Sequence, residues 1–103
     1  METKQKSETF SDIINGETLV LVDFFATWCG PCKTMSPILK DFASQMGDRV
    51  RVIKIDVDKA PTTAETYKIQ GVPTLILFRN GEILWRQSGV VQKSQLVKII
   101  NDL

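Results

Sequence analysis

The stretch TLVLVDFFATWCGPCK, residues 18–33, contains the signals that decide the fold of this chain. Its first half, residues 18–25, is a near-continuous apolar run that is interrupted only by Asp23. Such a run is typical of a strand in a parallel sheet, because both faces of that sheet are covered. Its second half places Cys29 and Cys32 where this strand ends and a helix is expected to begin.

Outward from this stretch, hydrophobic periodicity predicts alternating helices and strands. Residues 31–46 carry an apolar residue every three to four positions, which is typical of a helix, and Pro37 is expected to kink it. A short helix is predicted at residues 9–14, with Ser7 as its N-cap and Gly16 closing it. The other expected elements are a strand at 50–57, a helix at 61–68, strands at 74–78 and 83–87, and a helix at 92–103.

The order of these elements predicts an α/β fold. The first two strands flank a helix, so they should be parallel and joined by a right-handed crossover. The pair Asn80-Gly81 between two apolar runs is a strong hairpin signal, so the last two strands should be antiparallel. We therefore expect a central mixed β-sheet flanked by helices on both faces, in a single domain over residues 1–103.

Composition and charge disfavour several classes of protein. The chain has 13 Lys and Arg against 12 Asp and Glu, which gives no basic surface for nucleic acid. No apolar run is long enough to span a membrane, and the polar N-terminal residues do not resemble a secretory signal, so a cytoplasmic location is expected. With two Cys and no His, the chain lacks a Cys–His nucleophile pair and the ligands of a usual zinc site, so no metal is expected.

The spacing of Cys29 and Cys32 suits a disulfide that opens and closes. Residues three apart on a helix have Cα atoms about 5 Å from each other, within the range of about 4.4–6.8 Å that disulfides span. At a helix N-terminus, Cys29 faces unpaired amides that stabilise its thiolate and lower its pKa, whereas Cys32 should be shielded. We predict that Cys29 attacks and Cys32 resolves. Two inert core cysteines are the alternative, which the Gly-Pro insert at a strand–helix junction disfavours.

A stabilised thiolate is not by itself a fast reductant. The nucleophilicity of a thiolate falls as its pKa falls, which offsets most of the gain from having more thiolate present. Docking of the target disulfide and intramolecular attack by Cys32 must therefore contribute most of the acceleration.

Asp23 is the most informative residue outside the cysteine pair. An ionised carboxylate inside an apolar strand is costly to bury, and burial should raise its pKa. We expect Asp23 to accept or relay the proton of Cys32, through water, during the resolving step. A solvent-facing Asp at the end of the strand is the alternative.

The stretch Trp28-Cys29-Gly30-Pro31-Cys32-Lys33 and several segments around it resemble the thioredoxin family. The resemblance implies the thioredoxin fold, a cis peptide bond before Pro73, and a Lys54 close enough to Asp23 to modulate it. Phe25 departs from the family, in which many members carry Trp, and the N-terminal segment is short and polar where the family forms an edge strand. The similarity rests on residues 22–26, on Trp28-Cys29-Gly30-Pro31-Cys32-Lys33, on Pro37, on residues 54–58, on Gly71-Val72-Pro73-Thr74 and on Gly89.

The resemblance also implies a mostly apolar surface around Cys29 that receives target proteins. A cis bond before Pro73 would turn the Val72 backbone outward, where it could pair with an extended substrate as a strand does. The alternatives are a plain turn for Pro73, core packing for Trp28 and a turn for Gly89, while Trp85 is expected to be a half-buried strand residue. The expected surface comprises Trp28, Gly30, Pro31, Val72, Pro73 and Gly89.

The implied function is the reduction of disulfides in other proteins by dithiol–disulfide exchange, as an electron carrier without a bound cofactor. The implied partners are disulfide-containing proteins and an NADPH-dependent thioredoxin reductase as electron donor, and a monomer is expected. An oxidant or isomerase of the same fold is the first alternative, although Gly30-Pro31 is similar to the reducing type. A binding module whose cysteines are incidental is the second.

Overall fold

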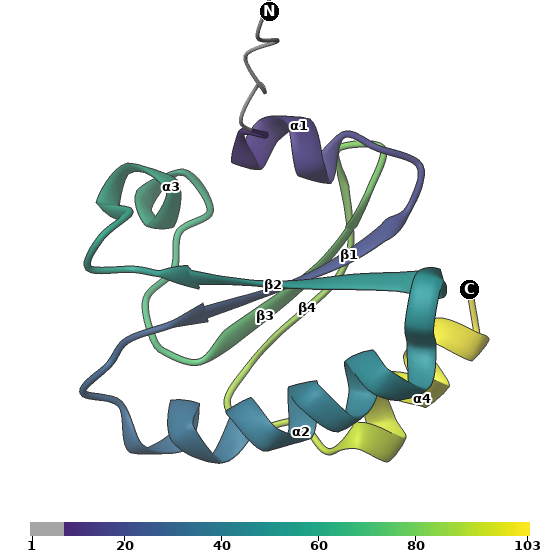
Figure 1. The fold of residues 1–103 in the computed structure, drawn as a ribbon. Helices are drawn as coiled ribbons and strands as arrows, with labels where there is room; N and C mark the ends of the chain where they lie inside the picture. The colour runs from purple at the N-terminus through teal and green to yellow at the C-terminus, as the bar shows by residue number, and fades with distance from the viewer. Residues whose placement is uncertain (1–7) are drawn as a thin grey trace, which may run out of the picture.

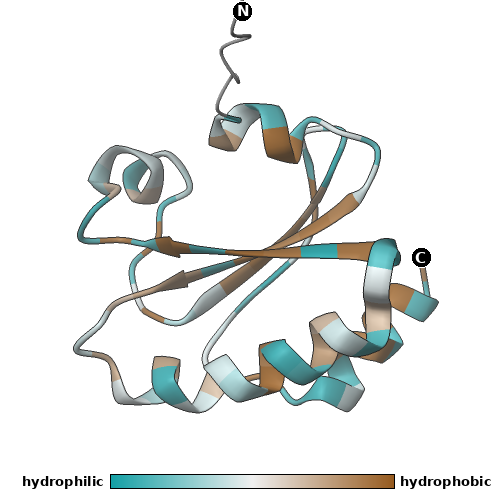
Figure 2. Ribbon diagram, in the orientation of Figure 1, coloured by the Kyte–Doolittle hydropathy of each residue, from teal (hydrophilic) through white to brown (hydrophobic). Residues whose placement is uncertain are grey.

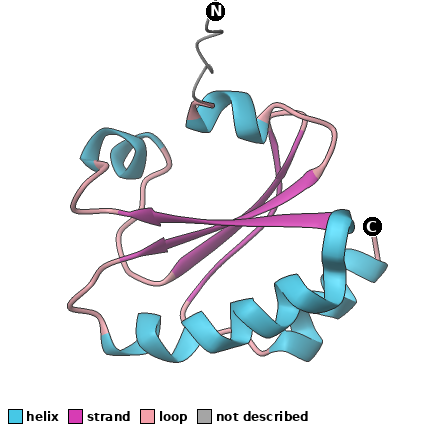
Figure 3. Ribbon diagram, viewed as in Figure 1, coloured by secondary structure: helices cyan, strands magenta, loops and turns pink. Residues whose placement is uncertain are grey.

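The structure is a computed structural model that describes residues 8–103. Every helix and strand predicted from the sequence is present, with ends that differ by one or two residues (Figure 3). Within residues 8–103, no helix combines the length and the apolar character needed to cross a membrane. In chain order the elements are α1 (Phe10–Ile14), β1 (Leu19–Phe25), α2 (Gly30–Met46), the 3-10 helix η1 (Gly47–Arg49), β2 (Val50–Asp56), α3 (Pro61–Thr66), β3 (Thr74–Arg79), β4 (Glu82–Ser88) and α4 (Lys93–Asn101).

The four described strands form one mixed sheet in the order β2-β1-β3-β4. Strand β1 pairs in parallel with β2, and the pairs β1–β3 and β3–β4 are antiparallel. Helices α1 and α3 lie on one face of this sheet, and α2 and α4 lie on the other (Figure 1). The predicted fold class, a mixed sheet with helices on both faces, is confirmed.

Strand β1 is buried on both faces because it lies inside the sheet. Its side chains alternate, so that Val20, Val22 and Phe24 pack with Phe10 of α1, while Leu21 packs with residues of α2 and α4. Figure 2 shows the strands as largely hydrophobic, which fits a sheet covered by helices on each side. The run of apolar residues in this part of the sequence is therefore explained by burial on both faces of the sheet.

The hairpin between β3 and β4 forms at the predicted pair. Asn80 has a φ of 53° and Gly81 a φ of 77°, both in the left-handed region that a tight hairpin turn of this kind requires. The N–H of Asn80 donates to the carbonyl of Gly16 at 2.9 Å, and the N–H of Gly81 donates to that of Ile14 at 2.8 Å. The turn is thereby tied to the last residue of α1 and to the loop that follows it.

The capping of α1 differs from the prediction. Ser7 lies outside the described residues, and Thr9 is the N-cap: its Oγ1 accepts from the N–H of Asp12 at 3.0 Å, and its own N–H donates to the Asp12 carboxylate at 3.2 Å. This reciprocal pair is a capping box, which the sequence analysis overlooked. The helix ends at Ile14 as predicted, but its C-cap is Asn15, one residue before the Gly16 that was expected to close it.

The sequence also raised the questions of whether Pro37 interrupts its helix and whether a strand precedes β1. Helix α2 continues through Pro37 as a single helix of 17 residues. Residues 8–18 contain α1 and its flanking loops rather than a strand, so among the described residues no edge strand precedes β1.

Phe10 anchors α1 to the sheet through aromatic contacts. The centroid of its ring lies 6.3 Å from that of Phe24, 5.7 Å from that of Tyr67 and 6.0 Å from that of Phe78. We predict that Phe10→Ala lowers the free energy of unfolding by about 2–3 kcal/mol, less than for a fully buried Phe because Phe10 is half-buried. Urea titration measures this, with the milder Phe10→Leu as the matched variant. An unchanged urea midpoint in Phe10→Ala would show that α1 does not stabilise the sheet.

Candidate functional site

Cys29 and Cys32 form a disulfide at the start of α2, with their Cα atoms 5.3 Å apart. This separation agrees with the distance expected from their spacing in a helical turn. Cys29 is the N-cap of α2, and its Sγ accepts a hydrogen bond from the backbone N–H of Cys32 at 3.1 Å. The predicted contact between a cysteine sulfur and the free amides of a helix N-terminus is therefore present.

The two cysteines are equally buried. Each is 4% exposed, so the predicted shielding of Cys32 is observed but does not distinguish it from Cys29. What differs is their position, because Cys29 precedes the first turn of α2 and Cys32 lies within it. No cluster of three or more His, Cys, Asp or Glu side chains that could hold a metal ion occurs among residues 8–103.

The loop before β3 lies against the start of α2. The peptide bond between Val72 and Pro73 is cis, as the family resemblance implied, and Pro73 is buried. The Sγ of Cys29 lies 3.6 Å from the carbonyl oxygen of Val72. The N–H of Gly89 donates to the carbonyl of Pro73 at 2.8 Å, and its φ of 92° is strained for residues with a side chain. The fold thus gathers Cys29, Val72, Pro73 and Gly89.

Trp28 is a surface residue rather than part of the core. Its side chain is 70% exposed, and its indole Nε1–H donates to the Asp58 carboxylate at 2.9 Å. The ring borders a hollow of about 140 Å³ that Val57, Ile69 and Val72 also line. Asp58 belongs to the stretch 54–58 that resembles the family, but no local pattern signals its contact with Trp28. Trp85, by contrast, is half-buried on β4 as expected.

Asp23 is fully buried in the middle of β1. Neither of its carboxylate oxygens has a hydrogen-bond partner among residues 8–103. Burial raises the pKa of Asp23 to about 6, and the positive charge of Lys54 partly offsets this rise. The two residues are Cα partners in the parallel pairing of β1 and β2. Because Asp23 is 0% exposed, the alternative of a solvent-facing Asp at the strand end is wrong.

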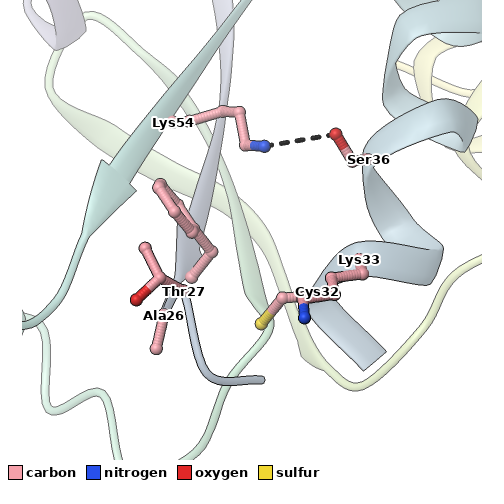
Figure 4. A pocket seen from close by; sticks show the side chains of 7 residues that line it. Ala26, Thr27, Cys32, Lys33, Ser36 and Lys54 are labelled. Carbon is pink, nitrogen blue, oxygen red and sulfur yellow. Dashed lines mark hydrogen bonds between the residues drawn. The ribbon is translucent and has the colours of Figure 1, made fainter. Parts of the chain in front are cut away.

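The side chain of Lys54 extends from β2 to α2. Its Nζ donates to the Oγ of Ser36 at 3.3 Å (Figure 4) and lies 4.7 Å from the centroid of the Phe25 ring. Phe25, Cys32, Ser36 and Lys54 all line one hollow of about 220 Å³. Sequence analysis did not single out Ser36. Its spacing of seven residues from Cys29 predicts that both lie on one face of the helix, but no local pattern indicates that this face is opposite Lys54.

The chain is similar to known proteins over nearly its whole length. The model of the family described as Thioredoxin matches residues 2–102. This chain belongs to the thioredoxin family. It is 44% identical over 99 residues to "Thioredoxin-like protein slr0233" of Synechocystis sp., covering 95% of this chain and 94% of that protein. It is also 44% identical over 100 residues to "Thioredoxin Y1, chloroplastic" of Arabidopsis thaliana. That match covers 96% of this chain and 58% of the relative.

A solved structure, that of chloroplastic thioredoxin z, has a similar fold. The TM-score is 0.77 at 38% sequence identity, with 84% of this chain and 78% of that chain covered. Family membership and a Cys-x-x-Cys pair at disulfide distance identify this chain as a thiol–disulfide oxidoreductase.

The burial of Asp23 makes the stability of the protein depend on pH. The pKa of this carboxyl is about 6 in the folded chain against an ordinary 3.8, so between these values the folded state binds more protons than the unfolded state. The contribution of Asp23 to stability is therefore most favourable at acidic pH, falls as the pH rises through this interval and levels off above it. The difference between the two pKa values corresponds to a contribution of Asp23 to the free energy of unfolding that is lower by about 3 kcal/mol at neutral pH than at acidic pH.

We predict that Asp23→Asn is more stable than the wild type by about 3 kcal/mol at neutral pH, because the amide carries no charge to bury. The two proteins should converge in stability near pH 4. Urea titration of both oxidised proteins at the two pH values measures this, with the exposed Asp41→Asn as the matched control for removing one carboxylate. A stability difference that is the same at both pH values would contradict the prediction.

Proposed function

We propose that this chain reduces disulfides in other proteins, with Cys29 as the attacking and Cys32 as the resolving thiol. The thiolate of Cys29 attacks one sulfur of the target disulfide, the target S–S bond breaks, and the other target sulfur leaves as a thiolate. The thiolate of Cys32 then attacks the Cys29 sulfur of the mixed disulfide and releases the second target thiolate. Two electrons pass to the target, and the chain is left with the Cys29–Cys32 disulfide that the structure contains.

The observation that carries this assignment is the hydrogen bond from the Cys32 amide to the Cys29 sulfur. An amide donor and the positive end of the α2 dipole stabilise negative charge on the sulfur at the N-cap. Cys32 lies within the first turn of α2, so its sulfur does not occupy the N-cap position where the free amides point. Cys29 is therefore the better thiolate, and also the one beside the exposed Trp28 and the Val72 carbonyl.

Asp23 is proposed to accept the proton that Cys32 loses before it attacks. It follows Leu21 by two residues on β1, so both side chains are on the face of the sheet that α2 covers. With a pKa of about 6 its carboxylate is largely ionised at neutral pH and is a better base than an exposed Asp. Lys54, held by Ser36 and the Phe25 ring, is proposed to limit how far that pKa rises.

The surface around Cys29 is proposed to receive an extended segment of the target. Trp28, Gly30 and Pro31 are exposed, and the carbonyl of Val72 lies beside the attacking sulfur. That carbonyl can accept a backbone N–H from the target, as in strand pairing. Substrate-binding residues in this proposal are Trp28, Gly30, Pro31, Val72, Pro73 and Gly89.

The proposal extends to the electron donor, the oligomeric state and the cellular compartment of this chain. An NADPH-dependent thioredoxin reductase would return the disulfide to the dithiol, and the whole chain, residues 1–103, would act as one monomeric domain. A dithiol reductant works where thiols are kept reduced, which favours the cytoplasm, although the names of some relatives place them in chloroplasts. Oxidation of NADPH by a mixture of this protein, thioredoxin reductase and insulin tests the donor, and cell fractionation tests the compartment.

The two cysteines should give different phenotypes. We predict that Cys29→Ser loses reduction of insulin disulfides, because the attacking thiolate is gone. Cys32→Ser should instead accumulate a covalent mixed disulfide with the target, since attack proceeds and resolution does not. Non-reducing electrophoresis and mass spectrometry detect this adduct. Insulin turnover by Cys29→Ser equal to that of the wild type would contradict the proposed function.

Asp23→Asn should slow the resolving step. We predict a fall of about tenfold or more in the rate of target release at neutral pH, because no carboxylate remains to accept the Cys32 proton. In the wild type this rate should rise with pH around the pKa of about 6, and the Asn variant should lack that inflection. Stopped-flow measurement of single turnovers separates this step from the first attack. A wild-type rate profile in the variant would remove Asp23 from the mechanism.

A further inference from the structure

A groove runs along the side of the molecule where α2 faces β2. It consists of two hollows, of about 220 Å³ and about 290 Å³, that share Ser36 and Lys54. The first hollow begins at Cys32, and the second continues along α2 as far as Ala43. We call it the α2–β2 groove: its floor is apolar and includes Phe25, Leu39 and Val52, and its rim carries Lys33, Lys40 and Lys54.

The charge in this groove is of one sign. Three lysines line it and no Asp or Glu does, although the whole chain has 13 Lys and Arg against 12 Asp and Glu. Within residues 8–103, the ion pairs are those of Arg51 with Glu8 and of Lys98 with Asp102, so none of the three groove lysines forms an ion pair there. Asp23, opposite Lys54 in the sheet, offsets part of the charge of that lysine, but it is fully buried and does not line the groove, so Lys33 and Lys40 remain as exposed charges on its rim.

The groove is aligned with the attacking sulfur. Cys29, Lys33, Ser36, Lys40 and Ala43 recur at intervals of three and four residues, which places them along one face of α2. At about 1.5 Å per residue, Lys33 and Lys40 lie about 6 Å and about 16 Å from Cys29 along the helix axis. An extended chain advances about 3.3 Å per residue, so these distances correspond to about two and about five residues.

We propose that the α2–β2 groove binds an acidic segment of the target protein, with carboxylates about two and about five residues from the cysteine under attack. This inference rests on the proposed reduction of protein disulfides and names a class of preferred target. The groove shares no lining residue with the hollow beside Trp28 and Val72. The target therefore contacts two surfaces, an apolar one around Val72 and a cationic one along α2.

The lysines act on the encounter rather than on sulfur chemistry. A single exposed charge pair contributes little, but several charges of one sign raise the rate of association with an opposite partner and lose this effect in salt. The apolar floor gives the stems of acidic side chains a place to pack. The signature of the groove is consequently a salt-dependent preference between two substrates that differ only in charge.

The test uses two disulfide-linked peptide homodimers, each chain of which has one cysteine. In the first peptide, glutamates occupy the second and fifth positions on both sides of the cysteine, and in the second peptide these are glutamines. Pre-reduced wild type, Lys40→Glu and Arg79→Glu are mixed with each peptide, and the second-order rate of protein thiol oxidation is measured at low and high salt. Arg79 is exposed at the end of β3 away from the site, so its variant controls for the same change in net charge.

At low salt the wild type should reduce the glutamate peptide about fivefold faster than the glutamine peptide, and this preference should disappear at high salt. Lys40→Glu should lose or reverse the preference while Arg79→Glu keeps it. Equal rates for the two peptides in the wild type, an undiminished preference in Lys40→Glu, or the same loss in Arg79→Glu would each overturn the proposal. If the wild type reduces neither peptide at either salt concentration, the proposed function itself has failed.

Discussion

The backbone N–H of Cys32 points at the sulfur of Cys29 because α2 begins directly after Cys29. A helix N-terminus leaves amides without partners in the chain, and a sulfur at the N-cap is where they find one. The position of that N-cap is in turn set by β1, which is buried on both faces and ends four residues earlier. The buried strand therefore holds the reactive end of α2 in a fixed place beyond the carboxyl end of β1.

Behind the cysteines, the protein tolerates an unfavourable charge. A carboxylate without a hydrogen-bond partner in the middle of β1 lowers stability at neutral pH, and an apolar residue there would pack at no such cost. Lys54 reduces the cost from the neighbouring strand, and Ser36 and the Phe25 ring hold the lysine in place. The proposed role of Asp23 in proton transfer gives this arrangement a chemical reason, because the burial that destabilises the anion also makes it a better base.

The two flanks of the disulfide differ in physical character. On one flank, Trp28 and Val72 border an apolar hollow, and the Val72 carbonyl, 3.6 Å from the Cys29 sulfur, is proposed to pair with the backbone of the target. On the other, three lysines line the α2–β2 groove. Apolar and backbone contacts accept many sequences, whereas a row of like charges discriminates among them. Reactivity and selectivity are thus separated in space around one sulfur.

Sequence alone determined what depends on neighbours along the chain. Local sequence patterns indicated the four α-helices and the four strands but not the 3-10 helix η1, and the Asn80-Gly81 pair indicated the hairpin. The Cys-x-x-Cys spacing predicted the separation of the two cysteine Cα atoms, because it is set within one turn of backbone. The N-cap of α1 was misassigned since several polar residues there could serve. Tertiary structure decided the contacts between distant segments: Val72 with Cys29 across 43 residues, Trp28 with Asp58 across 30 and Lys54 with Ser36 across 18. Each of them requires strand pairing and helix packing to be complete, and no local pattern encodes the order in which strands lie side by side.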